Sequence, residues 1–384
     1  MRLCEKPYRH MKYYLIAGEA SGDLHASNLM KAIQLKDPKA EFRFWGGELM
    51  QAIGGTLVTH YKNLAFMGFL EVLKNIHTLT RFIKECKQDI AIYKPDVLIL
   101  VDYAGFNLRI APFAKKLGIP THFYIAPKLW AWNEKRVEKF KKYIDELYVI
   151  FPFEKDFFEK KHQYPVHYVG NPLQDVIADR PPTKVKRFRT EKQLGEKPII
   201  ALLPGSRLQE IKKMLPLMVQ LSKEFTAYQF VIAGAPNREY SFYEPYIKDS
   251  KVAVVLNKTY DLLSIANAAL VTSGTATLET ALFKVPQAVC YETSRLTYFV
   301  GKMLVKNLKY FSLVNLIMDA PIVAELLQRD FNKARVRKEL KAILDPANRI
   351  KIFENYLELE DKLGGKGASE TVAEILLEKI QHKK

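Results

Sequence analysis

The chain has 384 residues and a formal net charge of +17, from 59 Lys and Arg residues against 42 Asp and Glu residues. This length exceeds one typical domain, so we expect two α/β domains. The hydrophobic share of 48% is enough to build a core in each. The charge favours polyanionic partners, among them anionic lipid surfaces and phosphorylated substrates. Nucleic acid is not an expected partner, because no recognised nucleic-acid-binding motif accompanies the charge.

Cysteine and histidine usage argues against disulfides and metals. The three cysteines, Cys4, Cys86 and Cys290, lie far apart in the sequence, and the eight histidines form no HxH or HxxxH pair. We therefore expect a reducing compartment and no metal site. The first ten residues lack the apolar core of a signal peptide, and no apolar run reaches 18 residues. These features predict a cytoplasmic protein, either soluble or peripheral on a membrane.

Short apolar runs alternate with helix-length amphipathic stretches, which is typical of buried parallel strands in an α/β fold. In chain order the predicted strands are Tyr13–Ala17, Val97–Val101, His122–Ile125, Leu147–Ile150, Ile199–Leu203, Gln229–Ala233, Ala268–Thr272 and Gln287–Cys290. From Asn332 onward the pattern is almost wholly helical.

The segment 180–197 interrupts this alternation with two adjacent prolines and a run of basic residues. Such a stretch is typical of a linker or an exposed loop. It predicts two Rossmann-like domains, 1–180 and 181–384, with terminal helices that can pack back onto the first. Two such domains in tandem imply a cleft, and ligands in open α/β sheets lie at the carboxyl ends of strands.

The loop after the first predicted strand, residues 17–23, carries two glycines and two acids. Glycines allow a tight turn and close approach to a ligand, so Ser21 and Gly22 are candidate substrate contacts. Glu19 and Asp23 suit hydroxyls or positive groups and are candidate bases. A GxGxxG dinucleotide fingerprint is absent, and no cofactor is expected. The alternative is a tight turn in which Asp23 caps the next helix.

Asp102 directly follows the strongly apolar strand Val97–Val101. A carboxylate at that end of a strand can accept a proton from a sugar hydroxyl, as an inverting glycosyl transfer requires. Asn107, in the same motif, is a candidate substrate contact. The alternative is that Asp102 only caps the following helix.

The segment 124–132 holds two of the three tryptophans, Trp130 and Trp132. Aromatic side chains in a loop can stack on a sugar or contact acyl chains, so Trp130 is a candidate substrate contact. The alternative is a pair of core tryptophans that anchor a helix.

Two motifs in the second half suit a diphosphate and a ribose. In 203–207, a turn of small residues enters a helix, where Ser206 can contact an anion and Arg207 can clamp phosphate oxygens. The alternative is an ordinary strand-to-helix turn.

In 272–279, Ser273, Gly274 and Thr275 offer amides and hydroxyls to a diphosphate, and Glu279 can reach paired ribose hydroxyls. The alternative here is a capping box that ends at Glu279.

Two further segments carry weaker signals. Residues 65–73 are rich in large apolar side chains, which predicts a lipid-contacting patch made of Phe66, Met67, Phe69 and Leu70; the alternative is a buried helix. Asn315, after a basic stretch, can hydrogen-bond a base or a sugar.

Together the motifs resemble those of lipid-A-disaccharide synthases over roughly residues 12–330. The matching segments are AGEASGDLH at 17–25, MGFLEVL at 67–73, VDYAGFN at 101–107, YIAPKLWAW at 124–132, VGNPL at 169–173, LLPGSR at 202–207 and TSGTATLE at 272–279. Two positions depart from the family pattern: Asn171 replaces a histidine that is frequent there, and Val314 replaces a proline.

The resemblance implies a metal-independent GT-B glycosyltransferase with an acceptor-binding first domain and a UDP-sugar-binding second domain. The implied donor is UDP-2,3-diacylglucosamine and the implied acceptor is 2,3-diacylglucosamine 1-phosphate. The products would be UDP and a β-1′,6-linked disaccharide phosphate, formed with inversion. Asp102 would be the base, with Glu19 and Asp23 as alternatives, and Arg207 would hold the diphosphate. The expected location is the inner face of the inner membrane, where the chain would contact the anionic surface, and a homo-oligomer is compatible with the sequence.

Two other readings remain open. A UDP-sugar epimerase or another glycosyltransferase of the same fold would share the phosphate and ribose motifs without needing the apolar patch. A non-catalytic lipid-binding module would need only the charge and the patch.

Overall fold

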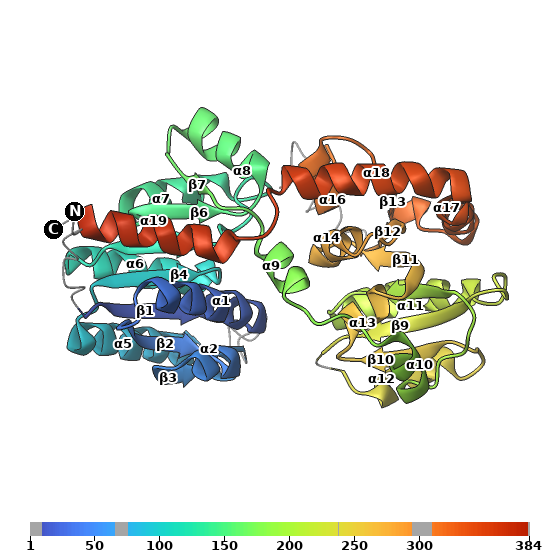
Figure 1. The fold of residues 1–384 in the computed structure, drawn as a ribbon, viewed down its shortest axis with the longest axis horizontal. Helices are drawn as coiled ribbons and strands as arrows, with labels where there is room; N and C mark the ends of the chain where they lie inside the picture. The colour runs from blue at the N-terminus through green and yellow to red at the C-terminus, as the bar shows by residue number, and fades with distance from the viewer. Residues whose placement is uncertain (1–9, 66–75, 237, 294–308, 383–384) are drawn as a thin grey trace, which may run out of the picture. The chain divides into compact units, whose positions relative to one another are not determined.

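The computed structural model describes residues 10–65, 76–236, 238–293 and 309–382 (Figure 1). The chain forms two compact units. The first unit contains the residues up to Asp175 and those from Gly365 onward, and the second contains Val176–Gly364. The chain therefore passes from one unit to the other twice.

The first unit contains a parallel seven-stranded sheet in the order β3-β2-β1-β4-β5-β6-β7. Its strands are β1 (Lys12–Ala17), β2 (Glu41–Gly46), β3 (Thr56–His60), β4 (Val97–Val101), β5 (Thr121–Tyr124), β6 (Glu146–Val149) and β7 (His167–Tyr168). Its helices are α1 (Ala20–Lys36), α2 (Glu48–Ile53), α3 (Tyr61–Ala65), α5 (Ile76–Tyr93), α6 (Ala104–Lys116), α7 (Val137–Tyr143), α8 (Pro152–Asp156) and α19 (Ala368–His382). Helix α9 (Pro172–Ala178) spans the first boundary between the units.

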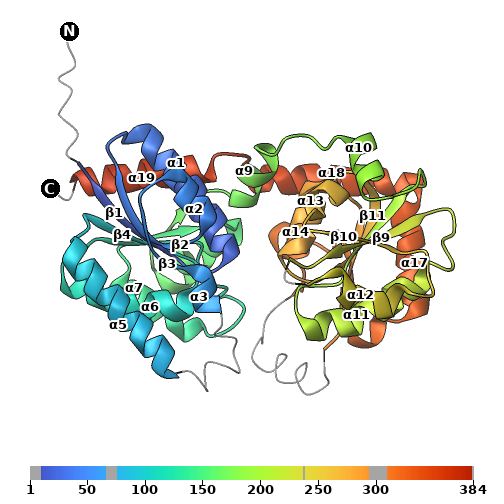
Figure 2. The same ribbon diagram turned by 90° about the horizontal axis from the view of Figure 1, so that it is seen from below.

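Helices cover both faces of this sheet because its central strands are apolar on both sides. All five residues of β4 are buried. On one face, Tyr14 and Ile16 share a core with α5, α6 and α7. On the other face lie α1 and the C-terminal helix α19, which pack against each other (Figures 1 and 2).

Two ion pairs and one cap fix α19 on the first unit. Lys36 of α1 lies 2.8 Å from Glu374, and Lys379 lies 3.4 Å from Glu146. The carboxylate of Asp175 accepts hydrogen bonds from the first amides of α19, including 2.7 Å from Gly367 and 3.1 Å from Ser369. A carboxylate at a helix N-terminus satisfies amides that the helix leaves unpaired.

The second unit contains a parallel six-stranded sheet in the order β10-β9-β8-β11-β12-β13. Its strands are β8 (Ile199–Leu203), β9 (Gln229–Gly234), β10 (Ala253–Leu256), β11 (Ala266–Thr272), β12 (Gln287–Tyr291) and β13 (Ala324–Leu327). Its helices are α10 (Val185–Glu191), α11 (Leu208–Leu221), α12 (Tyr240–Ile247), α13 (Thr259–Leu263), α14 (Thr275–Leu282), α16 (Leu313–Met318), α17 (Lys333–Leu344) and α18 (Pro346–Lys362).

Alternate residues of β8 point to opposite faces, so this sheet also has a core on each side. Ile200 and Leu202 pack with α11, α12 and α17, whereas Ile199, Ala201 and Leu203 pack with α10 and α13. The last helices begin at sequence-encoded caps. Asp345 accepts the amides of Ala347 and Asn348 at the start of α18, where Pro346 takes the first helical position.

The predicted α/β class, with two Rossmann-like units and a helical C-terminus, is confirmed. All eight predicted strands are present, with ends that shift by at most two residues. Five strands were not predicted, and they lie at or next to the sheet edges: β2, β3, β7, β10 and β13. In the described part of the chain, no helix has both the length and the apolar character needed to cross a membrane.

Candidate functional site

The predicted motifs follow the strands at which each sheet reverses its winding. In the first sheet the order runs outward from β1 on one side and from β4 on the other, and in the second sheet from β8 and β11. Loops after two such strands leave toward opposite faces and bound a ligand crevice. Residues 18–23 and 102–107 follow β1 and β4, and residues 204–207 and 273–279 follow β8 and β11. These four motifs therefore lie at the sheet edges where ligands bind in open α/β folds.

Asp102 occupies a strained turn at the end of β4. Asp102 and Tyr103 both have positive φ angles, 47° and 45°, a conformation that non-glycine residues rarely adopt and that is enriched at functional sites. The Asp102 amide donates to the Tyr124 carbonyl at 2.9 Å, and the Asn107 side chain donates to the Asp102 carbonyl at 2.7 Å. Both ends of the Asp102 backbone are thereby fixed.

Burial, one amide and one nearby cation define the environment of the Asp102 carboxylate. Among the described residues no side chain caps α6, whose N-cap is Tyr103. Burial raises the pKa of the Asp102 carboxyl, while the Tyr103 amide and the positive charge of Lys128 act in the opposite direction. A carboxylate with a raised pKa is a stronger proton acceptor than one with an ordinary pKa.

The loop after β1 packs directly against this turn. A Cβ atom on Gly18 would overlap the ring of Tyr103, so glycine is needed here for the two loops to touch. Helix α1 begins at Ala20 with Glu19 as its N-cap, which makes the loop shorter than the predicted 17–23. Ser21 is exposed in the first turn, whereas Gly22 is buried. Glu19 is exposed, and its charge adds to the effect of burial in raising the pKa of Tyr103.

The Asp23 carboxylate is engaged by main-chain amides. Its side chain is 2% exposed and accepts hydrogen bonds from the amides of Gly47, Leu49 and Met50 at 2.7, 3.1 and 3.2 Å. These amides begin α2, so Asp23 caps a helix other than its own. Of the three candidate bases, Asp23 is the one already engaged by three donors.

Asn107 is fully buried and faces the main chain rather than the surface. Besides Asp102, its amide nitrogen lies 3.4 Å from the Val101 carbonyl and 3.5 Å from the Ile16 carbonyl. Asn107 therefore links the carboxyl ends of β1 and β4 and holds the main chain of Asp102 in place.

Trp130 is anchored by a buried acid that the sequence analysis missed. Its indole nitrogen donates to Glu154 at 3.1 Å, and its ring meets Phe153 edge-on at 4.9 Å. Glu154 is fully buried, and burial raises its pKa to about 7 despite the hydrogen bonds it receives. The sequence signal was Pro152 followed by an acid at the third helical position, a capping arrangement. Trp132, by contrast, is 50% exposed.

In the second unit, Arg207 is presented to solvent. Its side chain is 84% exposed and lies 3.6 Å from Glu210, whose carboxylate also accepts the Arg207 amide at 3.2 Å. Gly205 has a φ of 101°, and a Cβ there would lie 2.6 Å from the Glu210 carboxylate. Glu210 thus holds the main chain of the turn, and the side chains of Arg207 and Ser206 remain exposed.

The motif after β11 forms the start of α14. Gly274 is the N-cap, Thr275 is exposed, and the Ser273 hydroxyl donates to the Phe311 carbonyl at 3.2 Å. The first amides of a helix are suited to an anion. Within α14, Glu279 is largely buried, and burial raises the pKa of its carboxyl. Tyr260 of α13 donates a hydrogen bond to Glu279 at 2.9 Å; this tyrosine was not predicted.

Asn315 is a structural residue in this structure. It is 1% exposed, its side chain pairs with the main chain of Val323 in both directions, and it donates to Glu325 at 2.9 Å. Glu325 also accepts the amides of Phe311 and Ser312. Asn315 and Glu325 together fix the turn that precedes α16.

The apolar patch, the two departures from the family pattern and the expectation about metals remain to be compared with the structure. The lipid-contacting patch, residues 66, 67, 69 and 70, lies outside the described residues. The departures Asn171 and Val314 are both fully buried, and Asn171 accepts the Leu173 amide at 3.0 Å. Across residues 10–65, 76–236, 238–293 and 309–382, no cluster of three His, Cys, Asp or Glu side chains is arranged to hold a metal ion.

Several solved structures share this architecture. The MnaA–UDP complex from S. aureus matches with a TM-score of 0.69 and 13% identity, covering 97% of each chain. The UDP-GlcNAc 2-epimerase from Neisseria meningitidis, bound to UDP-GlcNAc, matches with a TM-score of 0.68 and 15% identity over 96% of this chain and all of that one. The calicheamicin glycosyltransferase CalG4 matches with 0.60 and 14% identity over 97% and 99%. The chain thus has the GT-B fold of glycosyltransferases and UDP-sugar epimerases.

The family follows from closer relatives. The family model described as lipid-A-disaccharide synthetase matches residues 13–378. Lipid-A-disaccharide synthases are 35% identical in Coxiella burnetii over 370 residues (94% of this chain, 96% of the relative) and in Geobacter metallireducens over 380 residues (96% and 97%). The chain belongs to the lipid-A-disaccharide synthetase family. The predicted resemblance is confirmed, and the protein is a glycosyltransferase of lipid A biosynthesis.

Proposed function

We propose that the protein transfers 2,3-diacylglucosamine from its UDP derivative to 2,3-diacylglucosamine 1-phosphate, giving UDP and a β-1′,6-linked disaccharide phosphate with inversion. The observation that carries this proposal is the division of chemistry between the two sheets. The edge of the first sheet presents a partly buried carboxylate, Asp102, whereas the edge of the second presents an exposed guanidinium, Arg207, and a helix N-terminus. Family membership supports the choice of reaction.

Asp102 is proposed to be the general base. As the acceptor's 6-hydroxyl oxygen attacks the anomeric carbon, Asp102 takes its proton, and the bond from the anomeric carbon to the UDP oxygen breaks. A single displacement of this kind inverts the anomeric centre. The raised pKa of Asp102 and its fixed backbone support this role, because a base must be both basic enough and positioned.

The departing UDP gains negative charge, which Arg207 and the start of α14 are proposed to offset. Arg207 can bind phosphate oxygens in a bidentate manner, and the amides that follow Gly274 add the positive end of a helix dipole. Glu279 is proposed to accept hydrogen bonds from the ribose hydroxyls. Charge stabilisation of this type can replace a metal ion, so activity without added metal is part of the proposal.

The membrane role rests on charge. A net charge of +17 attracts the anionic inner face of the inner membrane, where both acylated substrates reside by their chemistry. We propose peripheral association there, with residues 66, 67, 69 and 70 supplying apolar contact.

The decisive experiment is turnover of UDP-2,3-diacylglucosamine with 2,3-diacylglucosamine 1-phosphate, with mass detection of the disaccharide phosphate. NMR of the new linkage would establish its anomeric configuration. Equal turnover of UDP-GlcNAc, or its conversion into an epimer without any acceptor, would overturn the proposal in favour of another reaction on the same fold.

A further inference from the structure

Tyr260 is the polar partner of the carboxylate proposed to bind ribose. Among the described residues, its hydroxyl supplies the one hydrogen bond that Glu279 receives, at 2.9 Å. Burial disfavours the charged form of Glu279, and the hydrogen bond from Tyr260 partly opposes this effect. A carboxylate has about four acceptor positions, so one bond to Tyr260 leaves capacity for two further hydroxyl donors.

The ring of Tyr260 packs in an aromatic contact. It packs against Phe283 with ring centroids 5.2 Å apart, and the guanidinium of Arg180 lies 5.8 Å from the Phe283 ring. Arg180 stacks on Phe283 rather than on the tyrosine. The ring contact with Phe283 and the hydrogen bond to Glu279 hold the two ends of the Tyr260 side chain. Its hydroxyl can therefore act as a fixed donor rather than a mobile one.

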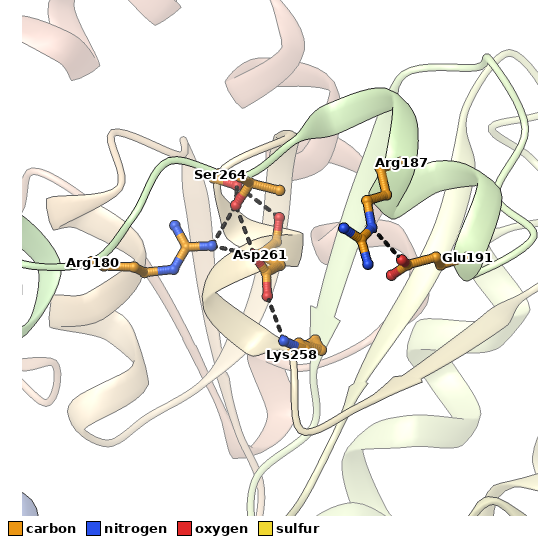
Figure 3. A network of polar contacts seen from close by, with 7 residues as sticks. Arg180, Arg187, Glu191, Lys258, Asp261 and Ser264 are labelled. Atoms are coloured by element: carbon orange, nitrogen blue, oxygen red, sulfur yellow. Dashed lines mark hydrogen bonds and ion pairs between the residues drawn. The ribbon is translucent and has the colours of Figure 1, made fainter.

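The next residue along α13 ties the helix to the segment that enters the second unit. Asp261 accepts hydrogen bonds from Arg180 and, at 2.8 Å, from Thr183, and it lies 3.6 Å from the ammonium of Lys258 (Figure 3). Although burial opposes its ionisation, these partners hold the pKa of Asp261 below its usual value. A charged network of this kind keeps a helix as short as α13, which has five residues, in a fixed position.

We propose that Tyr260 is a positioning residue that sets the selectivity of the nucleotide site for ribose over deoxyribose. Its hydroxyl holds one carboxylate oxygen of Glu279 and leaves the carboxylate's other acceptor positions for the ribose hydroxyls. The inference rests on the proposed function, in which Glu279 contacts the ribose. It adds a residue from a different helix, together with the Arg180–Asp261 network that supports it.

The test compares the affinity for UDP with that for 2′-deoxy-UDP by calorimetry. The wild-type protein should prefer UDP by about tenfold or more, the value of one hydrogen bond to a charged group. Tyr260→Phe removes the hydroxyl but keeps the ring against Phe283, and it should reduce this preference by about threefold to tenfold. Glu279→Ala should abolish the preference.

A matched control is Tyr356→Phe. Tyr356 is a fully buried tyrosine of the same unit, whereas Tyr260 is partly buried, and the Tyr356 hydroxyl lies 3.4 Å from the side-chain nitrogen of Gln287. The control should lose a buried hydroxyl without any change in the preference for UDP. This comparison separates loss of stability from loss of ribose selectivity.

The outcomes distinguish the two proposals. Equal wild-type affinity for UDP and 2′-deoxy-UDP would overturn the assignment of Glu279 to ribose. If Glu279→Ala loses the preference but Tyr260→Phe retains it in full, the role of Tyr260 is overturned and that of Glu279 stands. Should Tyr260→Phe not fold, Asp261→Asn provides the second variant: a reduced preference supports the proposal, and an unchanged preference overturns it.

Discussion

Replacing Asp102 by asparagine should nearly abolish glycosyl transfer while leaving the fold and UDP binding intact. Asparagine keeps the size of the side chain and tolerates the left-handed conformation that this position requires, with its φ of 47°. It also keeps the ability to interact with the Tyr103 amide. What it loses is the capacity to take a proton from the acceptor hydroxyl.

The size of the effect follows from the role. A positioned general base typically contributes about 10²–10⁴-fold to the rate, which corresponds to about 3–5 kcal/mol of activation free energy at about 1.4 kcal/mol per factor of ten. The folded protein should not be less stable. Because burial raises the pKa of Asp102, its ionised form costs folding free energy at neutral pH, and the neutral amide removes that cost.

Three measurements check this reasoning: the initial rate of disaccharide formation, the affinity for UDP by calorimetry, and the melting temperature. Glu19→Gln and Asp23→Asn are the controls. Asp23→Asn should lower the melting temperature, because three amides of α2 lose a charged acceptor. If Asp102→Asn keeps more than about a tenth of the wild-type rate, well above what a lost base allows, Asp102 is not the base and Glu19 becomes the first candidate.

Four further outcomes are expected. Arg207→Ala should weaken UDP binding by about tenfold to a hundredfold with an unchanged melting temperature, because the side chain is 84% exposed; unaltered affinity in calorimetry would refute the contact. Lys128→Met should raise the pKa of Asp102 further, so the rate, which is full above that pKa and lost below it, should begin to fall at a higher pH; an unmoved pH–rate profile would count against this coupling. Activity should survive EDTA, whereas loss with EDTA and recovery with magnesium would contradict the proposed metal independence. The protein should sediment with anionic vesicles and be released by high salt, and Phe66→Ser with Phe69→Ser should reduce the salt-resistant fraction; unfolding of that double variant would identify the patch as core.

The strands that the sequence predicted are the ones buried on both faces. β1, β4, β5 and β6 form the middle of one sheet, and β8, β9, β11 and β12 the middle of the other. Central parallel strands read as continuous apolar runs, which can be recognised without any partner. Four of the missed strands are less buried: β3 and β7 have no buried residue, and β10 and β13 have one each. The exception is β2, with four of its six residues buried. The pairing of the four less buried strands depends on the neighbouring strand and leaves little local signal.

For the candidate site, the sequence predicted where the site residues lie better than where their side chains point. That residues 102, 207 and 273–275 follow apolar strands could be read locally. That Asp23 faces α2, that Asn107 faces the ends of β1 and β4, and that Asn315 faces Glu325 could not, because each partner comes from a segment that the local pattern does not include.

Site positions can be predicted from the sequence and side-chain contacts cannot, for a physical reason. The winding of a parallel sheet reverses at its central strands, and those strands are also the most apolar because helices cover both of their faces. The loops of the ligand-binding edge therefore follow the strands that are easiest to predict from the sequence. The groups that tune the site come instead from packed neighbours: Glu154 reaches Trp130, and Tyr260 reaches Glu279, from other helices. A sequence motif thus indicates where the chemistry occurs, whereas the protonation state and aim of each group depend on tertiary contacts, and substitutions at Tyr260 should alter ligand selectivity without touching any motif residue.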